Sequence, residues 1–534
     1  MVQQQLPTGF RDDVGALAER KDDMGRYVLD LCRNRGYTKI STPLMEYKDV
    51  FQGYAMGRQH MYEFLDGTAK SIVVRPDLTM PIGRFLATTN IELPRKFYYL
   101  GDVLGRTEKH RGGINQVTQG GIELVGYKSM AAEQECIDLI KEVNQTQLKG
   151  ALQLELGDAR FAFAITDALG LSDDERIPLL DALFAKNIPL YESIIEVYEN
   201  SALYPFLAVW PRLFGTIDEV LSELSGVILP APAQRLWDAL MDFGQSVEAD
   251  GQAVRIDLSN QPPQSYYTGL TFRGFVDGVS QYIVSGGRYD NLLNNFDGNP
   301  VHAVGMAFNI DVLTDVSASV TSAVTSGSGK LRIALTKGRV EEQAVPLLEA
   351  CGIDCEPLRN KARKLIIPLG DELEIILVKG GDVTTYLNNG VVDIGIVGSD
   401  VLDEQEQTSY QLLDLKTGQC QFILASLGGY NPKEGRRQRI GTKYPVVTKR
   451  YFGAQDVEII KIEGSVELAP LVGLADAIVD ITETGTTLRE NNLEIFDRLQ
   501  HISTRLVANP LALKQKRNII FKLIDQLSEE INQQ

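Results

Sequence analysis

Residues 314–329, TDVSASVTSAVTSGSG, divide this sequence more clearly than any other segment. They contain no Lys, Arg or aromatic residue and consist mainly of Ser, Thr, Ala, Val and Gly. Such a composition is typical of a flexible linker, because it offers too few large apolar side chains to bury a core. The segment therefore predicts two folded parts, residues 1–313 and 330–534, joined by a linker.

The composition of the 534-residue chain excludes several classes of protein. Its 53 Lys and Arg against 71 Asp and Glu give a net charge of −18, whereas a nucleic-acid-binding surface requires a basic face. No apolar stretch reaches the roughly 18 residues of a membrane span, and the polar start does not resemble a secretory signal. Five cysteines and four histidines do not support a disulfide framework or a His-based metal site. We expect a cytoplasmic protein that binds neither nucleic acid nor membrane.

The second part alternates between strand-like and helix-like segments. The expected strands are 331–336, 364–369, 374–379, 393–402 (running into a loop), 421–428 and 439–444. The expected helices are 340–352, 381–390 and an amphipathic helix at the C-terminus, and 476–496 predicts a strand, a polar turn and a helix. Alternation of this kind favours an α/β architecture with mainly parallel strands.

The first part has a less regular pattern. Two antiparallel strands are expected at 95–106 and 115–126, around a basic loop, and residues 130–245 are expected to be mostly helical. Further strands are expected at 37–47 and within 254–293, a helix is expected at 18–36, and 71–88 is expected to be a strand leading into a helix. Blocks of antiparallel strand with a helical insertion indicate an α+β domain.

The strongest chemical signal is AIVDITETGTTL at 477–488, in which an apolar strand ends at Asp480 and a small polar turn leads into a helix. Helix N-termini present unpaired N–H groups that bind phosphate, and Gly485 permits close approach of a ligand to the backbone. Asp480 and Glu483 could hold ribose hydroxyls or water on Mg²⁺. Further hydroxyl donors would come from Thr484, Thr486 and Thr487. The alternative is a threonine cap on an ordinary strand-to-helix turn.

A second signal consists of cations near the start of the second part. Lys337, Gly338 and Arg339 follow the first strand, and a turn with two cations suits an oligophosphate. The alternative is a solvated turn. Arg363 precedes a buried strand and could point into the same cleft. The basic run at 436–439 is more consistent with a solvated loop.

Six segments of the second part together resemble the short-form catalytic subunit of ATP phosphoribosyltransferase. They are TKGRV, ARKLIIP, DIGIVGSDVL, RIGTKYPVVTKRYF, EGSVELAPLVGLADAIVD and TETGTTLRENNL, and they cover essentially all of 331–534 in order. The resemblance implies two α/β lobes similar to a type II periplasmic binding protein, with the active site between them. Lobe I would comprise about 330–425 and 502–534, and lobe II about 426–501.

The resemblance also implies the reaction and its residues. ATP would react through N1 with C1 of phosphoribosyl pyrophosphate (PRPP), the first step of histidine biosynthesis, with Mg²⁺ as cofactor. Loop 483–487 would hold the 5-phosphate of PRPP and Asp480 would approach the ribose. Arg339 and Arg363 would face pyrophosphate, and Lys337, Gly338 and Arg339 would face the ATP phosphates. Few residues follow His501, so we expect a short form that needs a separate histidine sensor.

Motifs of the first part resemble the core of histidyl-tRNA synthetase and, more closely, the synthetase-related regulatory subunit of ATP phosphoribosyltransferase. They are RPDLT (75–79), the 95–126 strand pair, YYTG (266–269), GGRYDNLL (286–293) and VHAVGMAF (301–308). The resemblance covers about 5–313 and implies a class II synthetase-like domain with an antiparallel sheet. Two departures argue against amino-acid activation: 307–316 lacks the ATP-gripping Arg, and SNQPPQ (259–264) replaces an Arg-containing loop.

A pocket for free histidine is implied at Asp77, Gln119, Glu123 and Tyr267, although these residues could also be relics of the fold. We therefore expect a regulatory subunit fused to its catalytic subunit, inhibited by histidine, and a homo-oligomer through both parts. The first rival is a tRNA ligase with an appended domain, which the charge and the missing Arg disfavour. The second is a non-enzymatic small-molecule binding protein, which the KGR and TETGTT segments disfavour.

Overall fold

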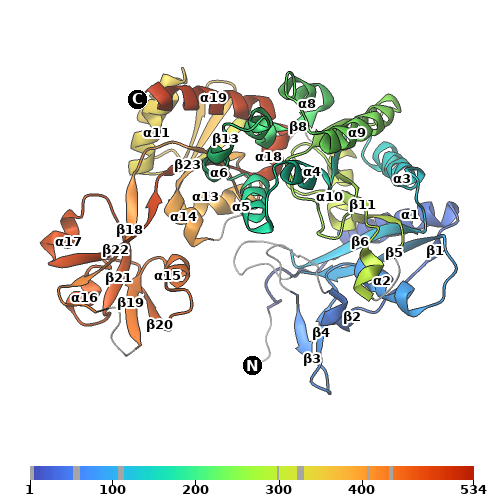
Figure 1. The fold of residues 1–534 in the computed structure, drawn as a ribbon, viewed down its shortest axis with the longest axis horizontal. Helices are drawn as coiled ribbons and strands as arrows, with labels where there is room; N and C mark the ends of the chain where they lie inside the picture. Colours follow the sequence, from blue (N-terminus) through green and yellow to red (C-terminus); the bar gives the residue numbers. More distant parts are fainter. Residues whose placement is uncertain are drawn as a thin grey trace. The chain divides into compact units, whose positions relative to one another are not determined.

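The computed structural model describes residues 5–51, 61–105, 114–296, 300–321, 330–405, 409–431 and 437–533. The chain separates into two units, residues 1–184 with 190–327 and residues 185–189 with 328–534 (Figure 1). Each unit contains its own sheets and its own apolar core, so each is described by itself. Most of the basic loop predicted after residue 106, and Arg436, lie outside the described residues.

A nine-stranded sheet forms the centre of unit 1, in the order β1-β5-β6-β12-β11-β10-β7-β9-β8. The predicted strand pair is confirmed, because β5 (Arg95–Leu104) and β6 (Gln116–Val125) pair in antiparallel register. The other strands are β1 (Thr38–Lys39), β7 (Gln153–Asp158), β8 (Phe214–Thr216), β9 (Val254–Asp257), β10 (Leu270–Phe275), β11 (Val284–Arg288) and β12 (Ala303–Asn309). A separate small sheet contains β2 (Met45–Tyr47), β3 (Glu63–Leu65) and β4 (Ser71–Val74).

Helices cover this sheet and supply the insertion. The region predicted to be helical between 130 and 245 is confirmed apart from the short strands β7 and β8. The helices of unit 1 are α1 (Ala16–Asn34), α2 (Thr79–Thr88), α3 (Ala131–Gln147), α4 (Phe161–Ala168), α5 (Asp173–Phe184), α6 (Ile188–Ile195), α7 (Tyr204–Val209), α8 (Ile217–Glu223), α9 (Ala231–Ala249) and α10 (Ile310–Thr321). Helix α1 packs against α10, β5 and β6.

Helix α10 corrects the predicted linker, because its second half lies within residues 314–329. Leu313 is fully buried, Val316 is 5% exposed and Thr314 is 3% exposed. Ile310, Leu313 and Val316 are three residues apart, so these apolar side chains lie on one face of the helix and join the unit 1 core. Residues 322–329 of the predicted linker lie outside the described residues.

Unit 2 contains two sheets. The six-stranded sheet has the order β14-β15-β13-β16-β23-β17, and the five-stranded sheet has the order β20-β19-β21-β18-β22. Figure 1 shows the five-stranded sheet with α15, α16 and α17 as one lobe and the six-stranded sheet with α11, α13 and α14 as the other. The strands are β13 (Leu331–Thr336), β14 (Ile366–Leu369), β15 (Leu373–Val378), β16 (Ile394–Gly398), β17 (Tyr410–Asp414), β18 (Cys420–Leu427), β19 (Gln438–Thr442), β20 (Val457–Lys461), β21 (Ala477–Thr482), β22 (Leu493–Ile502) and β23 (Thr504–Ala508).

The helices of unit 2 follow these strands closely. They are α11 (Arg339–Ala350), α12 (Glu356–Arg359), α13 (Gly380–Asn388), α14 (Ser399–Glu404), α15 (Pro445–Phe452), α16 (Leu468–Leu471), α17 (Thr486–Glu490), α18 (Pro510–Gln515) and α19 (Arg517–Gln533). Within the described residues, no helix combines the length and the apolar character that a membrane span requires.

Four predictions for unit 2 need correction. Parallel pairing is confined to β15-β13-β16 and β20-β19-β21, and the outer strands pair antiparallel, so the sheets are mixed. The helix predicted up to residue 496 ends at Glu490, because the following residues form β22 against β18. Residues 420–425 belong to the five-stranded sheet, so they lie in lobe II rather than lobe I. The segment after β16 is a helix, α14, rather than a loop.

The burial of α10 predicts where unit 1 can be cut. A fragment that ends at residue 309 should be several kcal/mol less stable than one that ends at 321, because burial of one large aliphatic side chain contributes about 1.5–3 kcal/mol. Urea denaturation of the two fragments measures the difference. A fragment that ends at 329 serves as the control and should match the 321 fragment, and equal midpoints for all three would contradict a structural role for α10.

Candidate functional site

Lobe I gathers cations at one edge of its sheet. Strands β13, β15 and β16 are parallel neighbours, so their carboxyl ends share that edge, where ligands bind in open α/β sheets. Lys337 follows β13, and its N–H donates to the carbonyl of Val378 at the end of β15, at 3.0 Å. Gly338 has φ +82°, a left-handed conformation that favours glycine, and α11 then begins at Arg339. Lys337 and Arg339 are both exposed to solvent.

Arg363 lies near the same edge. It precedes β14, and Ile366 at the start of β14 pairs with Ile376 near the carboxyl end of β15. The Arg363 side chain is exposed and makes no hydrogen bond or ion pair with any described residue. The sequence therefore located three cations that the sheet topology brings to one edge, although no contact joins Arg363 to the other two.

Lobe II presents carboxylates at the corresponding edge of its own sheet. Asp480 lies near the end of β21, beside β19, and is 8% exposed. Burial raises the pKa of Asp480 to about 6. The hydrogen bond that the N–H of Ile481 donates to the Asp480 carboxylate acts in the opposite direction and lowers this pKa. The nearby Lys443 charge acts to lower this pKa, and the Glu467 charge acts to raise it. A buried carboxylate with a raised pKa at a cleft edge is a candidate functional group.

The loop after β21 is open and rich in hydroxyl groups. Gly485 has φ +70°, and a Cβ at this position would meet no heavy atom within 4 Å. The Gly485 N–H donates to the Thr482 hydroxyl at 3.0 Å, and the hydroxyls of Thr484 and Thr486 are 2.9 Å apart. Thr484, Thr486 and Thr487 are exposed, so their hydroxyls remain accessible to a ligand.

One ion pair joins the two predicted loops across the lobes. The Arg339 guanidinium of lobe I lies 2.6 Å from the Glu483 carboxylate of lobe II. Both side chains are about half exposed, at 49% and 50%, so the pair contributes at most about 1 kcal/mol to stability. Its importance is geometric, because the pair brings the cation-rich edge of lobe I against the hydroxyl-rich loop of lobe II.

Three residues at this junction were not predicted from the sequence. Tyr444 of lobe II donates from its hydroxyl to the Asp400 carboxylate of lobe I at 3.1 Å. Glu404 of lobe I accepts from the N–H groups of Val446 and Val447, at 3.0 and 3.2 Å, at the start of α15. Asp400 follows the end of β16 and Tyr444 follows the end of β19, so their position after a strand was the signal that could have identified them.

The second candidate site lies in unit 1 and is centred on Glu123 of β6, which is 1% exposed. One carboxylate oxygen accepts from the Thr79 hydroxyl at 2.8 Å and from the Tyr99 hydroxyl at 3.2 Å. The other accepts from the Tyr289 hydroxyl. Burial raises the pKa of Glu123 to about 7, although these three donors act to lower it. The sequence motifs contained Thr79 and Tyr289 but did not indicate that they contact Glu123.

Glycines on neighbouring strands provide the space for this carboxylate. Glu123 of β6 pairs with Gly305 of β12, and Gly305 pairs with Gly287 of β11, so the three form one row across the sheet. A Cβ at Gly305 would overlap the Glu123 carboxylate, and a Cβ at Gly287 would lie 3.0 Å from the Tyr267 ring. The glycines therefore let two functional side chains lie flat on the sheet.

The other residues predicted to bind histidine differ in how many contacts they make with their neighbours. Asp77 is 5% exposed, and its carboxylate accepts from the Met80 N–H at 3.0 Å and from the Tyr266 hydroxyl at 3.4 Å. The Tyr267 ring packs against the Tyr266 ring at 5.1 Å between centroids. Gln119 lies four residues before Glu123 in β6 and thus on the same face, but its side chain makes no hydrogen bond to another described residue.

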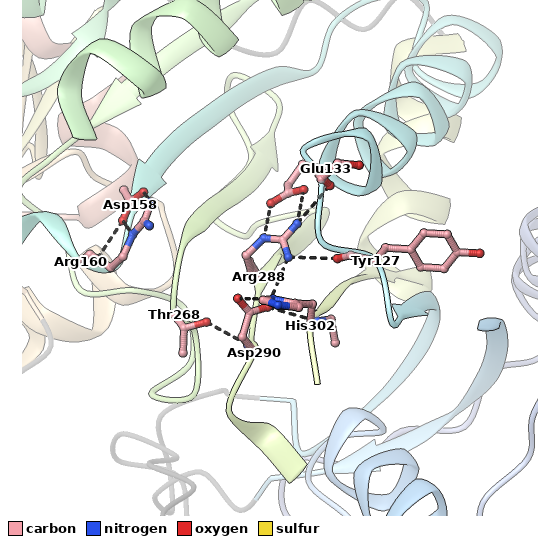
Figure 2. Close-up of polar contacts among 10 residues, drawn as sticks. Tyr127, Glu133, Asp158, Arg160, Thr268, Arg288, Asp290 and His302 are labelled. Atoms are coloured by element: carbon pink, nitrogen blue, oxygen red, sulfur yellow. Dashed lines mark hydrogen bonds and ion pairs between the residues drawn. The ribbon is translucent and has the colours of Figure 1, made fainter. Parts of the chain in front are cut away.

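The Arg of the GGRYD motif points to the opposite face of the sheet. Figure 2 shows Arg288 between Glu133 of α3 and Asp290, with a bidentate contact to Glu133 at 2.6 and 2.7 Å. His302 joins this network through Asp290, with the Nδ1 atom 3.0 Å from the carboxylate. Because Glu133 is fully buried, this network holds α3 against the sheet. Of this motif, Gly287 and Tyr289 face the Glu123 pocket.

The loop 259–264, which lacks the expected Arg, is held by hydrogen bonds at its first and third residues. Ser259 donates from its N–H and its hydroxyl to Asp257, at 2.9 and 3.1 Å. Arg273 donates to the carbonyl of Gln261 at 2.8 Å. The loop lines a cleft over β7, β9 and β10, on the sheet face that carries Glu123.

Comparison with known proteins gives two family assignments. The family model for histidyl-tRNA synthetase matches residues 9–313, and the model for ATP phosphoribosyltransferase matches residues 379–531. Over 60% of its length the chain is 39% identical to an ATP phosphoribosyltransferase regulatory subunit of Lactiplantibacillus plantarum, and it covers 85% of that protein. Over 38% of its length it is 62% identical to the ATP phosphoribosyltransferase of the same organism, and it covers 94% of that protein.

Solved structures support the fold of unit 1. The chain is similar to an ATP phosphoribosyltransferase regulatory subunit/histidyl-tRNA synthetase from Bacillus halodurans, with a TM-score of 0.53 and 22% identity, over 71% of this chain and 94% of that chain. It is also similar to a histidine–tRNA ligase subunit from Alicyclobacillus acidocaldarius, with a TM-score of 0.50 and 23% identity, over 60% of this chain and 98% of that chain. These likenesses confirm the class II synthetase-like fold predicted for the first part.

The glycine row predicts a specific packing defect. Gly305→Ala should destabilise the chain by about 1–3 kcal/mol, because the new methyl group and the Glu123 carboxylate cannot occupy the same space. Urea denaturation measures the loss. Gly67→Ala is the matched control, since a Cβ there would meet nothing within 4 Å. Adding Glu123→Ala to Gly305→Ala should cost less than the sum of the single changes, and full additivity would contradict the overlap.

Proposed function

Because the first part of the chain belongs to the histidyl-tRNA synthetase family and the second to the ATP phosphoribosyltransferase family, we propose a division of labour in which the second catalyses and the first senses histidine. The chain thus joins a part similar to regulatory subunits to a catalytic part. The contact that carries the proposal is the Arg339–Glu483 pair, which joins the loop expected to bind ATP to the loop expected to bind PRPP.

The reaction is the condensation of ATP and PRPP to N1-(5-phosphoribosyl)-ATP and pyrophosphate, the first step of histidine biosynthesis. N1 of adenine carries no proton, so the attack needs no general base. The difficult part is the departure of pyrophosphate from a ribose that becomes positively charged. Electrostatic stabilisation of both charges is therefore the main task of the protein.

The cations of lobe I suit the leaving group. We assign Lys337, Gly338 and Arg339 to the ATP phosphates, and Arg339 and Arg363 to pyrophosphate. All three cations are exposed at the strand ends, and Lys337 and Arg363 have no polar side-chain partner among the described residues. Among the described residues, Arg339 pairs only with the exposed Glu483, which a substrate phosphate can displace at small cost.

The carboxylates and hydroxyls of lobe II suit PRPP, the phosphoribosyl donor. Residues 483–487 would hold the 5-phosphate of PRPP through backbone N–H groups and threonine hydroxyls, and the open position at Gly485 supports close approach. Asp480 would lie near the ribose, where an ionised carboxylate stabilises the positive charge of the transition state. Its pKa of about 6 leaves it mostly ionised at neutral pH.

The residues of this site are compatible with a divalent metal ion that binds together with the substrate phosphates. The described residues contain no group of three His, Cys, Asp or Glu that would hold an ion alone, and Mg²⁺ commonly binds through substrate phosphates and one or two carboxylates. Asp480 and Glu483 are the carboxylates that could contribute. When bound, Mg²⁺ would neutralise charge on the pyrophosphate.

We assign the regulatory histidine site to Asp77, Gln119, Glu123 and Tyr267. The amino group of histidine is a cation, and two buried carboxylates whose charges act on each other, Asp77 and Glu123, favour such a ligand. The absence of an Arg from 307–316 removes the residue that would grip ATP for amino-acid activation, and 259–264 lacks the Arg of the synthetase's histidine loop. Bound histidine would then inhibit turnover through a coupling between two distinct sites.

The remaining assignments concern architecture. We propose that the two lobes of unit 2 correspond to the lobes of a type II periplasmic binding protein, joined by the β17–β18 and β22–β23 connections. We also propose that the chain divides into the two parts predicted from the sequence, with residues 314–321 assigned to the first part through α10. We further propose that the chain forms a homo-oligomer through both parts.

The first prediction for this function concerns pH. If ionised Asp480 acts on the ribose, kcat/KM for PRPP should fall as pH drops through about 6, and Asp480→Asn should remove this limb and lower turnover about tenfold or more. Formation of phosphoribosyl-ATP from ATP and PRPP gives the profile. Glu467→Gln should move the limb to lower pH and Lys443→Gln to higher pH, because each removes a charge that acts on Asp480.

Two results would contradict these assignments. Absence of any phosphoribosyl-ATP from the wild-type chain would reject the activity itself. An unchanged acid limb in Asp480→Asn would remove this carboxylate from the mechanism while leaving the activity intact.

A second prediction concerns histidine. Glu123→Gln keeps the size of the side chain but removes its charge, and Tyr267→Ala removes the ring over Gly287. Both variants should retain uninhibited turnover and should need more histidine for inhibition, by roughly 5–150-fold for a typical coupling free energy. Phe64→Ala, a change at an exposed side chain of the same unit, is the control. Unaltered histidine sensitivity in both variants would place the sensor elsewhere.

A further inference from the structure

Tyr444 connects the two lobes of unit 2 beside the candidate active site. It lies between the end of β19 and the start of α15 in lobe II. Its hydroxyl donates to the Asp400 carboxylate of lobe I at 3.1 Å. Its ring packs edge-on against Phe422 of β18, with centroids 5.0 Å apart. The side chain is thus held by its own lobe and reaches across to the other.

Within lobe II, a chain of hydrogen bonds leads from Tyr444 toward Asp480. The N–H of Tyr444 donates to the Thr442 hydroxyl at 2.9 Å, and this hydroxyl donates to the Val479 carbonyl at 2.7 Å. Thr442 is fully buried, so water does not compete for these bonds. Val479 directly precedes Asp480 in β21. The position of Tyr444 is therefore tied to the strand that carries the predicted catalytic carboxylate.

Lobe I holds the other end of the bridge firmly. Asp400 lies in the first turn of α14, directly after β16, and its carboxylate also accepts from backbone N–H groups at that turn. Glu404, one turn further along α14, accepts from the first N–H groups of α15. Helix α14 thus contacts lobe II both at Tyr444 and at α15, the helix that follows it.

We propose that Tyr444 is a positioning residue of the transferase reaction. Through Asp400, its hydroxyl holds the lobe II edge that carries Asp480 against the lobe I edge that carries Lys337 and Arg339. The inference rests on the proposed function, because it matters only if ATP phosphates bind to lobe I and PRPP to lobe II. The two reacting atoms are then supported by different lobes, and a misplacement of about 1 Å can cost roughly 100-fold in rate.

The test removes the hydroxyl and keeps the ring. Tyr444→Phe should lower kcat about tenfold, while PRPP affinity measured by calorimetry stays within about twofold. The melting temperature should fall by less than about 10 °C, the loss that one hydrogen bond to a carboxylate accounts for. Affinity is retained because the loop 483–487 and Asp480 remain intact within lobe II. A purely structural role of Tyr444 would instead lower the melting temperature by more than this and affect binding and turnover together.

Variants of Asp400 separate positioning from direct contact with substrate. Asp400→Asn can still hydrogen-bond with the Tyr444 hydroxyl, so it should turn over within about threefold of wild type. Asp400→Ala should match Tyr444→Phe, and the double variant Tyr444→Phe/Asp400→Ala should be no slower than either single variant, because both remove one bond.

Each contrary outcome has a defined meaning. The inference is wrong if Tyr444→Phe turns over at the wild-type rate. It is also wrong if Asp400→Asn is as slow as Asp400→Ala, because the charge of Asp400 would then act on substrate directly. An inactive wild-type chain would instead reject the proposed function. The two failures are distinguishable because every variant is compared with wild-type product formation in the same assay.

Discussion

Unit 2 depends on one constraint, which is that the carboxyl ends of parallel strands meet at the same edge of a sheet. In lobe I this edge carries Lys337 and Arg339, and in lobe II it carries Tyr444 and Asp480. The edges are also complementary in charge, with cations on one and carboxylates on the other. In the proposed reaction PRPP loses the negative pyrophosphate while its ribose becomes positively charged. Cations are therefore needed near the pyrophosphate, and carboxylates are needed near the ribose. The fold therefore divides the electrostatic task between lobes.

Unit 1 uses a buried carboxylate rather than exposed charges. Glu123 lies on a sheet surface cleared by glycines and is surrounded by three hydroxyl donors, and burial raises its pKa to about 7. Near neutral pH such a group is divided between its neutral and ionised forms. A cationic ligand favours the ionised form, because an opposite charge close by lowers the pKa of a carboxyl group. The same pocket gives little support to an anionic ligand, because Asp77 adds a second buried carboxylate.

Local sequence signals predicted many elements well, and tertiary contacts explain the failures. Strand β13 was predicted at its observed bounds, because it is an apolar run between a Lys and a polar turn, and such local signals determine where a strand begins and ends. The linker prediction failed at 314–321 because small residues conceal a helix whose apolar face is visible only against α1 and β6. The helix predicted up to residue 496 was wrong because pairing with β18 determines that β22 is a strand. Asp400 and Tyr444 could be placed after strands, but their contact spans two lobes and follows only from the assembled fold.

The energies of the contacts between the lobes bear on how regulation can work. The described junction contains the Tyr444–Asp400 bond, the bonds from α15 to Glu404, the bond from Gln500 to Asp403 and the exposed Arg339–Glu483 pair. Each of these hydrogen bonds has a carboxylate acceptor, and a hydrogen bond to a charged group contributes about 1.5–3 kcal/mol net, whereas an exposed pair contributes at most about 1 kcal/mol. A typical coupling free energy of about 1–3 kcal/mol is therefore equal to one or two of these contacts. On the proposed division of labour, histidine needs to weaken only one or two of them to change turnover. Because coupling is reciprocal in binding free energy, a substrate that restores those contacts must weaken histidine binding by the same factor.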